Sequence, residues 1–600
     1  MTERSSLQKD SATDKVGHAI LISRTKSESE KIELTARWIL QEFETYYSES
    51  RHIPDLAKQA FEQQDPRTSL ALSKKRLSMY SISIRDLGLE LKEAFPLVAE
   101  NEHLWDKVQT CYLSLIEGRY EADLAFAYIH SVRRKINQGE WKPVEYAFSA
   151  SSDTAADLST IVYRSFPGGE QASVETIAEI LKLPKFSTPY GNLARDATLV
   201  AERLNYVLSR RDQVQAIQKI EAIDAGFYRN RGVYIVGRIV LERGNLVPLI
   251  IALLNDDSGI YVDAVLNTEA DAHNLFSSTL ANFNVTNPYY HELTTFLHSI
   301  MPKRPSGLHY STIGFNHVGK VAVMSELQDE LARTNEVLET AIGFRGTVAI
   351  GFSAPSSAYN LKIIRDKPTA GYKWGEFEGI DSVLTKYGRV HEINRTGSML
   401  DNIIYYNLKL DEAWFDPELL EELLREASKS ISLQGDAVVF KYLIVQRRMT
   451  PLPVFLETAS PTDAEIAIVN LGYCIKNNAA ANIFNKDLDA RNYGVSRMLK
   501  VFLYDYDALE PFTGVKIRTN KDVVYGEEDT PDWYFEDGVV FLPEEIEAGL
   551  RIPNRSLVEL FREVHGDLLT TEYWERIQND LWAGRVPSLR VYPESRKLLR

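Results

Sequence analysis

The chain has 600 residues, of which 44% are hydrophobic, and this exceeds what one core usually organises, so we expect two domains. A formal net charge of −16 excludes nucleic acid and an anionic membrane surface as general partners, because both would repel the chain. The longest apolar run (247–254) is far shorter than the ~20 residues that cross a bilayer, the N-terminus lacks a secretory signal, and two cysteines fit a reducing cytoplasm, so we expect a cytoplasmic protein.

The first half of the chain predicts mostly helices. Residues 1–28 are polar and poor in aromatic side chains, which predicts a disordered tail. Apolar residues then recur at steps of three and four, and this period predicts helices near 30–46, 88–100, 103–117, 120–138, 196–222, 270–283 and 323–340. Three apolar stretches predict strands at 234–240, 246–254 and 260–266. We therefore expect a mostly helical regulatory domain over residues 29–335.

The second half, residues 336–600, contains the parts of a protein-kinase site in the order that this fold uses. A glycine-containing turn runs into an apolar strand, as a loop that closes over nucleotide phosphates would. The next strand carries Lys362 at its middle, the position of the lysine that contacts the α- and β-phosphates of ATP. An apolar strand that breaks into a Pro-containing link at 442–452 predicts the hinge between two lobes. The predicted nucleotide-binding turn comprises Ala341, Ile342, Gly343, Phe344, Arg345, Gly346 and Thr347.

The catalytic loop is predicted from the spacing of three polar residues. Asp487 is followed five positions later by Asn492, the interval of the kinase catalytic loop, and a short apolar run then leads to Asp505. The spacing predicts that Asp487 accepts the proton of the acceptor hydroxyl, while Asn492 and Asp505, on facing strands of a hairpin, hold Mg²⁺ against the phosphates of ATP. The pattern departs from the usual motif, since Tyr506 and Asp507 follow where Phe-Gly is typical.

Three weaker signals stay open or are rejected. Residues 314–320 have the spacing of a P-loop, but Val321 replaces the hydroxyl residue that binds Mg²⁺, so we predict no P-loop there. The carboxylate that pairs with Lys362 is either Glu376 or Glu378. The turn-rich segment 514–538 either recognises a protein substrate or is a solvated excursion.

These motifs resemble one family, isocitrate dehydrogenase kinase/phosphatase. The resemblance extends from about residue 30 to near the C-terminus, and the stretches that carry it are 226–240, 343–350, 361–366, 446–452, 479–487, 491–497, 502–507 and 560–586. It implies an α+β protein whose bilobal, protein-kinase-like C-terminal domain follows the regulatory domain. It further implies an enzyme that uses Mg²⁺ and ATP to phosphorylate a serine of isocitrate dehydrogenase, removes the phosphate at the same site, and so directs carbon between the tricarboxylic acid cycle and the glyoxylate bypass. AMP is implied as an allosteric effector that binds where the domains meet.

Two departures from the family pattern leave alternatives open. Arg491 stands where the family carries a lysine-type residue, which keeps the charge. Near 388–400 the family reads Arg-Val-Gly-Arg-Met-Ala-Asp, and its aspartate, which is linked to phosphatase activity, is expected to fall on Arg395 or Thr396, with Glu392 and Asp401 nearby. The alternatives are a kinase without phosphatase activity and a nucleotide-sensing pseudokinase that regulates isocitrate dehydrogenase by docking alone.

Overall fold

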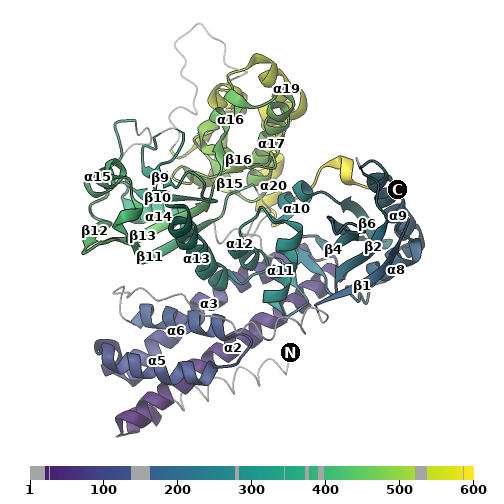
Figure 1. Ribbon diagram of the computed structural model, residues 1–600. Helices are drawn as coiled ribbons and strands as arrows, with labels where there is room; N and C mark the ends of the chain where they lie inside the picture. The colour runs from purple at the N-terminus through teal and green to yellow at the C-terminus, as the bar shows by residue number, and fades with distance from the viewer. Residues whose placement is uncertain are drawn as a thin grey trace, which may run out of the picture.

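The computed structural model describes most of the chain, with helices gathered at one end and two large sheets (Figure 1). Residues 1–20 of the expected disordered tail lie outside the described part. Residues 21–24 of the same segment are helical, and Ile22 is fully buried. The described residues are 21–25, 27–136, 162–211, 213–276, 283–343, 345–371, 377–389, 398–520, 537–585, 587–588 and 590–599.

Long helices form the N-terminal layer, drawn in purple and blue in Figure 1. Their starts are capped as the sequence dictates: Ser27 accepts a hydrogen bond from the amide of Glu30, and Asp65 caps the next helix ahead of Pro66. Their inward faces bury large aromatic side chains such as Trp38 and Trp105, which confirms the helical period predicted from the sequence. The helices are α2 (Glu28–Glu62), α3 (Pro66–Ala94), α4 (Pro96–Glu100), α5 (Glu102–Ile116) and α6 (Ala122–Ile136).

The regulatory region also contains a seven-stranded antiparallel sheet among its described residues, more strand than the sequence predicted. The helix predicted over 196–222 is wrong in its last part, because α9 ends at Ser209 and residues 217–223 form a strand between two others. Neighbouring residues point to opposite faces, so Ile235 packs towards α8 and α9 while Val236 packs towards the N-terminal helices. The elements are β1 (Tyr163–Gly169), α8 (Val174–Leu181), α9 (Leu193–Ser209), β2 (Ile217–Ile223), β3 (Phe227–Arg229), β4 (Gly232–Leu241), β5 (Leu246–Asp256), β6 (Gly259–Leu266), α10 (Glu269–Phe276), β7 (Asn284–Val285), α11 (Tyr290–Ile300), α12 (Ser306–Thr312) and α13 (Asn316–Thr334).

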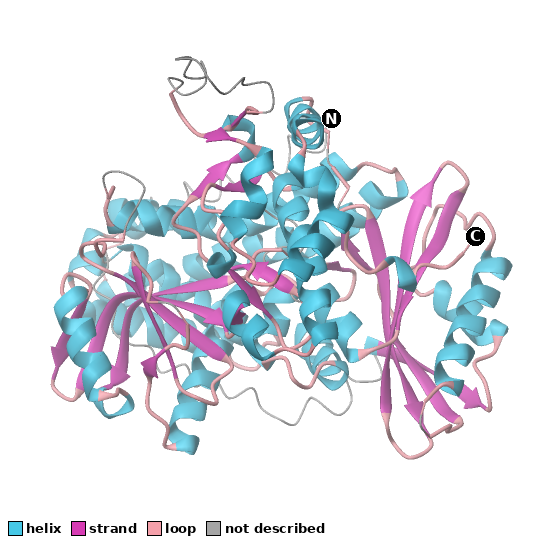
Figure 2. Cartoon of the chain, turned by 90° about the horizontal axis from the view of Figure 1, so that it is seen from above, coloured by secondary structure: helices cyan, strands magenta, loops and turns pink. Residues whose placement is uncertain are grey.

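A second sheet, of six strands in the described chain, forms the smaller lobe of the C-terminal half. Its strands follow the order β11-β13-β10-β9-β8, and β12 pairs with β13. The two large sheets lie at opposite ends of the molecule with helices between them (Figure 2). The elements are β8 (Glu339–Thr340), β9 (Ala349–Ser353), β10 (Tyr359–Ile364), α14 (Ile380–Arg389), β11 (Asn402–Asp411), η3 (Glu412–Trp414), α15 (Pro417–Glu426), β12 (Ile431–Gln434) and β13 (Ala437–Arg447).

The larger lobe is helical and carries three small sheets around the catalytic segment. Its last residues return to the regulatory sheet, where the amide of Leu598 donates to the carbonyl of Asp263 at 2.9 Å. The elements are β14 (Thr450–Pro451), α16 (Leu452–Thr458), α17 (Pro461–Ala480), β15 (Ile483–Asn485), η4 (Ala490–Asn492), β16 (Tyr493–Val495), β17 (Val501–Leu503), β18 (Leu509–Pro511), η5 (Phe512–Gly514), β19 (Lys516–Ile517), β20 (Val540–Phe541), η7 (Pro543–Glu545), α18 (Ile546–Leu550), α19 (Arg555–His565), η8 (Gly566–Leu569), α20 (Thr571–Trp582) and η9 (Glu594–Arg596).

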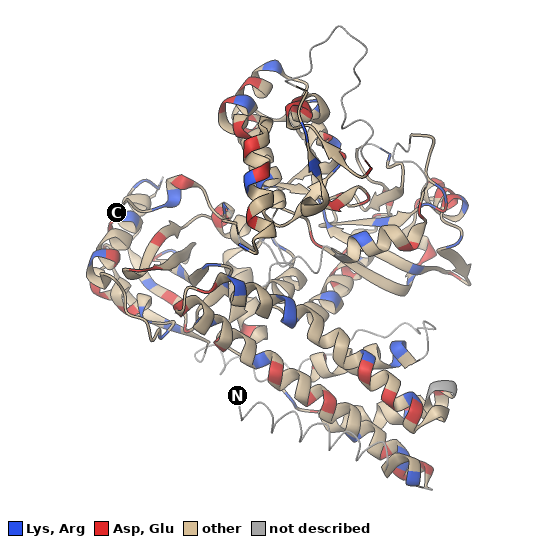
Figure 3. Cartoon of the chain, turned by 180° about the vertical axis from the view of Figure 1, so that it is seen from behind, with Lys and Arg blue, Asp and Glu red and all other residues tan. Residues whose placement is uncertain are grey.

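Helix α13 contributes to the hydrophobic cores of both halves, with Val318 in the cluster of the regulatory region. Other buried side chains of this helix, among them Met324 and Leu327, belong to the same hydrophobic cluster as the strands of the smaller lobe. The P-loop-like residue Lys320 lies on this helix and donates to the carbonyl of Ile404 at 2.6 Å. Basic and acidic residues are interleaved along the helices of the chain (Figure 3). None of the helices in the described ranges is long and apolar enough to span a membrane.

Candidate active site

A cavity of about 450 Å³ lies between the two lobes of the C-terminal half and collects nearly all the predicted site residues. Lys362, Asp487, Asn492 and Asp505 line it together, although 143 positions separate the first of them from the last. The turn over the cavity contributes Ala341, Ile342, Arg345, Gly346 and Thr347. The structure thus brings together four side chains whose proximity the sequence could only suggest.

Two residues of the predicted nucleotide-binding turn need separate comment. Phe344 lies outside the described residues. Gly343 does not line the cavity. Its φ is +130°, and a β-carbon at this position would lie 3.0 Å from Cγ of Pro451. Its backbone conformation and this close approach require glycine, so Gly343 shapes the turn rather than contacting a ligand.

Lys362 projects from the middle of β10, which pairs with β9 on one side and β13 on the other. Its ammonium donates to the carbonyl oxygen of Tyr504 at 3.0 Å and lies 4.7 Å from the centre of the Tyr504 ring. Burial lowers the pKa of Lys362, and the nearby charges of Asp505 and Asp507 oppose that shift. The lysine is therefore held against the segment that carries Asp505, the predicted metal ligand.

The carboxylate expected to pair with Lys362 is not found among the described residues. Glu376 lies outside them, and Glu378 is exposed, accepts a hydrogen bond from Ser382 and lies 4.0 Å from Lys386. In the described part of the chain, no carboxylate oxygen lies within 4.0 Å of the Lys362 ammonium. The ammonium instead bonds a backbone carbonyl, which leaves its charge available to phosphate.

The β16–β17 hairpin brings Asn492 and Asp505 to one place. Tyr493 is paired with Leu503, so the residues that flank the hairpin converge, and the amide of Tyr504 donates to the carbonyl of Asn492 at 3.1 Å. The side-chain amide of Asn492 donates to the carbonyl of Asp487 at 2.8 Å, which fixes the loop between them. Since the side-chain nitrogen of Asn492 is engaged in this hydrogen bond, the side-chain oxygen of Asn492 is the atom that could bind a cation.

A second carboxylate, Asp507, lines the same cavity and was not predicted as a site residue. Burial and the neighbouring charge of Asp505 raise its pKa to about 7, while the ammonium groups of Lys362 and Lys386 act in the opposite direction. The available signal was the spacing Asp-Tyr-Asp, because alternate residues of an extended segment point to the same side. Its depth in the cavity could not be read from the sequence.

The donor set fits Mg²⁺ held together with nucleotide phosphates. An amide oxygen from Asn492 and a carboxylate from Asp505 are the hard oxygen ligands that Mg²⁺ prefers, and this ion usually completes its shell with phosphate and water. Within the described ranges no group of three or more His, Cys, Asp or Glu side chains could hold a metal ion by itself. The site is thus suited to a cation that arrives with ATP.

The segment with the departure from the family pattern is partly described. Arg395, Thr396 and Glu392 lie outside the described residues, whereas residues 398–400 run beside β17, with the amide of Leu503 donating to the carbonyl of Ser398 at 2.9 Å.

A second register also matches this segment to the family pattern. Residues 395–401 read Arg-Thr-Gly-Ser-Met-Leu-Asp, which keeps Arg, Gly, Met and Asp at alternate positions of the family pattern. In this register the family aspartate would correspond to Asp401. Asp401 is buried and interacts electrostatically with Arg447 and with Arg304, which lies in the loop before α12.

Two lobes around a cleft that holds a strand lysine, a catalytic-loop aspartate and a pair of metal-binding oxygens define a protein of the kinase class. Comparison with known proteins narrows this class. The chain matches the family model "Isocitrate dehydrogenase kinase/phosphatase (AceK), regulatory domain" over residues 36–335 and the corresponding kinase-domain model over residues 336–594. The chain belongs to the isocitrate dehydrogenase kinase/phosphatase family.

Individual relatives agree with the family models. Proteins named isocitrate dehydrogenase kinase/phosphatase from Rhodopseudomonas palustris are 47% identical over 583 residues in strain BisB5, covering 96% of this chain and 95% of the relative, and 48% identical over 587 residues in strain HaA2, with the same coverage. A relative of the same name from Anaeromyxobacter sp. strain Fw109-5 is 30% identical over 568 residues, covering 94% of this chain and 97% of the relative.

Proposed function

We propose that this chain is a bifunctional enzyme that phosphorylates a serine of isocitrate dehydrogenase and removes the phosphate again. The observation that carries the proposal is the convergence of Lys362, Asp487, Asn492 and Asp505 on one cavity of about 450 Å³. The names of its relatives supply the protein substrate. The division into a regulatory domain over 29–335 and a catalytic domain over 336–600 belongs to the same proposal.

The kinase step follows from the positions of the side chains. The backbone of the turn before β9 covers the phosphates of ATP, and the ammonium of Lys362 contacts its α- and β-phosphates. Asp487 accepts the proton of the serine hydroxyl as the serine oxygen bonds to the γ-phosphorus, and the bond from that phosphorus to the bridging oxygen of ADP breaks. Asn492 and Asp505 would hold Mg²⁺, which would supply positive charge to balance the charge on the transferring group. Catalysis is then positioning and electrostatic stabilisation.

The phosphatase step uses the same cavity in this proposal. The family aspartate is retained as Asp401, next to the segment that pairs with β17 and leads to Asp505. AMP is proposed as an effector at the junction of the domains, where α13 shares its core with the smaller lobe. A cytoplasmic location is proposed as well, and the two free cysteines, Cys111 and Cys474, are in keeping with a reducing compartment.

A two-stage assay tests both activities. The purified protein is given isocitrate dehydrogenase with Mg²⁺ and ATP, and phosphoserine is followed by mass spectrometry. ATP is then removed, ADP or AMP is added with Mg²⁺, and phosphoserine is expected to disappear. Absence of phosphoserine in the first stage would leave only a docking protein, and its persistence in the second stage would leave only a kinase. Asp487→Asn serves as the control without phosphoryl transfer.

A further inference from the structure

Among the described elements, helix α14 follows the strand that carries Lys362, as does the kinase helix that supplies the glutamate paired with the strand lysine, but α14 presents different chemistry to the site. Tyr387, near its end, is fully buried, and its hydroxyl donates to Oδ1 of Asp505 at 3.1 Å. The preceding residue, Lys386, donates its ammonium to the carbonyl of Asp507 at 3.0 Å. Two consecutive side chains of one helix therefore hold both ends of the Asp-Tyr-Asp segment.

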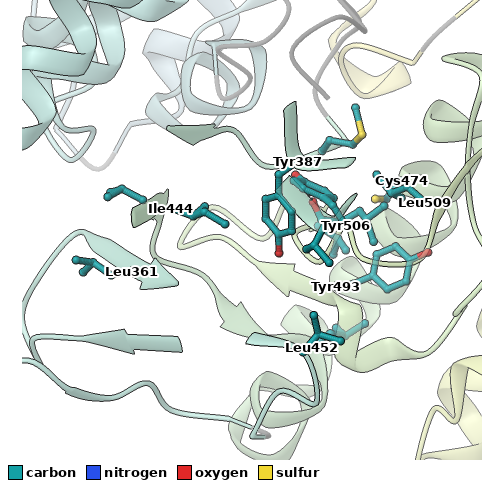
Figure 4. Close-up of a cluster of buried hydrophobic side chains, with 14 of the residues drawn as sticks. Leu361, Tyr387, Ile444, Leu452, Cys474, Tyr493, Tyr506 and Leu509 are labelled. Carbon is teal, nitrogen blue, oxygen red and sulfur yellow. Dashed lines mark hydrogen bonds between the residues drawn. The ribbon is translucent and has the colours of Figure 1, made fainter. Parts of the chain in front are cut away.

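The surroundings of Tyr387 restrict its ring. The ring meets that of Tyr506 edge-on, with centres 5.1 Å apart, and the Lys362 ammonium lies 5.9 Å from its centre. The side-chain amide of Asn402 donates to the backbone carbonyl of Tyr387 at 3.2 Å. Figure 4 shows Tyr387 beside Tyr506 among buried side chains of both lobes. A ring that is held on several sides keeps its hydroxyl at a fixed position.

We propose that Tyr387 is a positioning residue that replaces the usual glutamate of this helix and orients the Asp505 carboxylate for Mg²⁺. The Tyr387 hydroxyl donates a hydrogen bond to Oδ1 of Asp505 and so fixes the orientation of the carboxylate, which leaves Oδ2 to face the cation. This inference rests on the proposed function, because it assumes that Asp505 is a metal ligand.

A tyrosine suits this position better than a glutamate for an electrostatic reason. Asp505 and Asp507 already place two carboxylates beside one another, and a third would repel both. A phenol supplies a hydrogen bond to Asp505 without adding negative charge. Groups that orient a metal ligand in this way typically change metal affinity by about 10- to 100-fold when removed.

The test measures metal binding directly. Binding of Mn²⁺ in the presence of ADP is followed by electron paramagnetic resonance for the full-length wild type and for Tyr387→Phe, which removes a single oxygen. We expect binding weaker by about tenfold or more in the variant. The matched control is Tyr112→Phe, which removes a fully buried hydroxyl that donates to the carbonyl of Ala125 at 3.0 Å in the regulatory domain, and which should bind Mn²⁺ as the wild type does.

Two further measurements separate positioning from folding. The Mg²⁺ concentration for half-maximal kinase activity should rise in parallel with the loss of Mn²⁺ affinity in Tyr387→Phe, while the melting temperature of the metal-free protein should change no more than in the control. Tyr387→Glu, which restores the usual residue of other kinases, should bind Mn²⁺ more weakly than the wild type.

The outcomes distinguish the inference from the function beneath it. Equal Mn²⁺ affinity in the wild type and Tyr387→Phe would overturn the inference, and so would full affinity in Tyr387→Glu. Failure of the wild type itself to bind Mn²⁺ with ADP would instead overturn the assignment of Asp505 as a metal ligand, and with it the proposed function.

Discussion

Replacement of Lys362 by methionine separates the chemical role of this lysine from its structural one. The ammonium bonds only a backbone carbonyl within the described protein, at 3.0 Å, so we expect its charge to act mainly on ATP. Two unit charges 4 Å apart interact by about 4 kcal/mol at the effective dielectric constant of a protein site. Since ~1.4 kcal/mol corresponds to a factor of ten, Lys362→Met should lower kcat/KM for ATP by about 10³-fold.

The same substitution should leave the fold intact. Burial lowers the pKa of Lys362, which means that the folded protein binds this proton less tightly than the unfolded chain does. The charged side chain thus reduces the free energy of unfolding at neutral pH, and methionine fills a similar volume without that cost. The melting temperature of the nucleotide-free variant should equal or exceed that of the wild type.

A matched control is available in the larger lobe, between β16 and β17. Lys500 is another lysine whose burial lowers its pKa, to about 7, and it donates to the carbonyl of Asn274 at 2.7 Å, but it does not line the cavity. Lys500→Met should keep its kcat/KM for ATP in a steady-state assay with isocitrate dehydrogenase as acceptor. An unchanged kcat/KM in Lys362→Met, or a loss of equal size in both variants, would refute the reasoning.

Three further outcomes are expected. Asp487→Asn should abolish phosphoryl transfer but still bind Mg²⁺ with ADP in a calorimetric titration; near-normal turnover would contradict its role as the proton acceptor. Burial lowers the pKa of Lys320 to about 7, so the unfolded chain binds this proton more tightly than the folded protein, and the stability of the protein should rise with pH above about 7. The melting temperature of Lys320→Met should therefore exceed that of the wild type most near pH 6.5 and least near pH 10. A difference that does not change with pH would count against the lowered pKa of Lys320. Gly472→Ala should lower the free energy of unfolding by about 1–3 kcal/mol, because the added β-carbon would lie 2.1 Å from Cδ2 of the fully buried His565. Denaturant unfolding measures this change, and an unchanged midpoint would show that α17 and α19 can move apart without cost.

Local order along the chain predicted the catalytic elements well. Lys362 in a strand, and Asp487, Asn492 and Asp505 around a hairpin, could be placed because each depends on a few neighbouring residues whose spacing dictates a turn or a strand. Residues 217–223 could not, since they read as a continuation of a helix and become a strand only because β1 and β4 bind them on both edges. Pairing partners far away in the chain overrode the local preference there.

The amino-acid sequence by itself determined the class of the protein, because it contains, in the order and at the intervals typical of kinases, the residue types that kinases use to hold Mg²⁺ and ATP. Only the tertiary structure decided how those residues are supported. Three properties arise from side chains that meet across the two lobes. They are the lack of a described carboxylate within 4.0 Å of the Lys362 ammonium, the hydrogen bond from the Tyr387 hydroxyl to Asp505, and the raised pKa of Asp507. Burial and long-range contact set these properties, and neither follows from the spacing of residues along a chain.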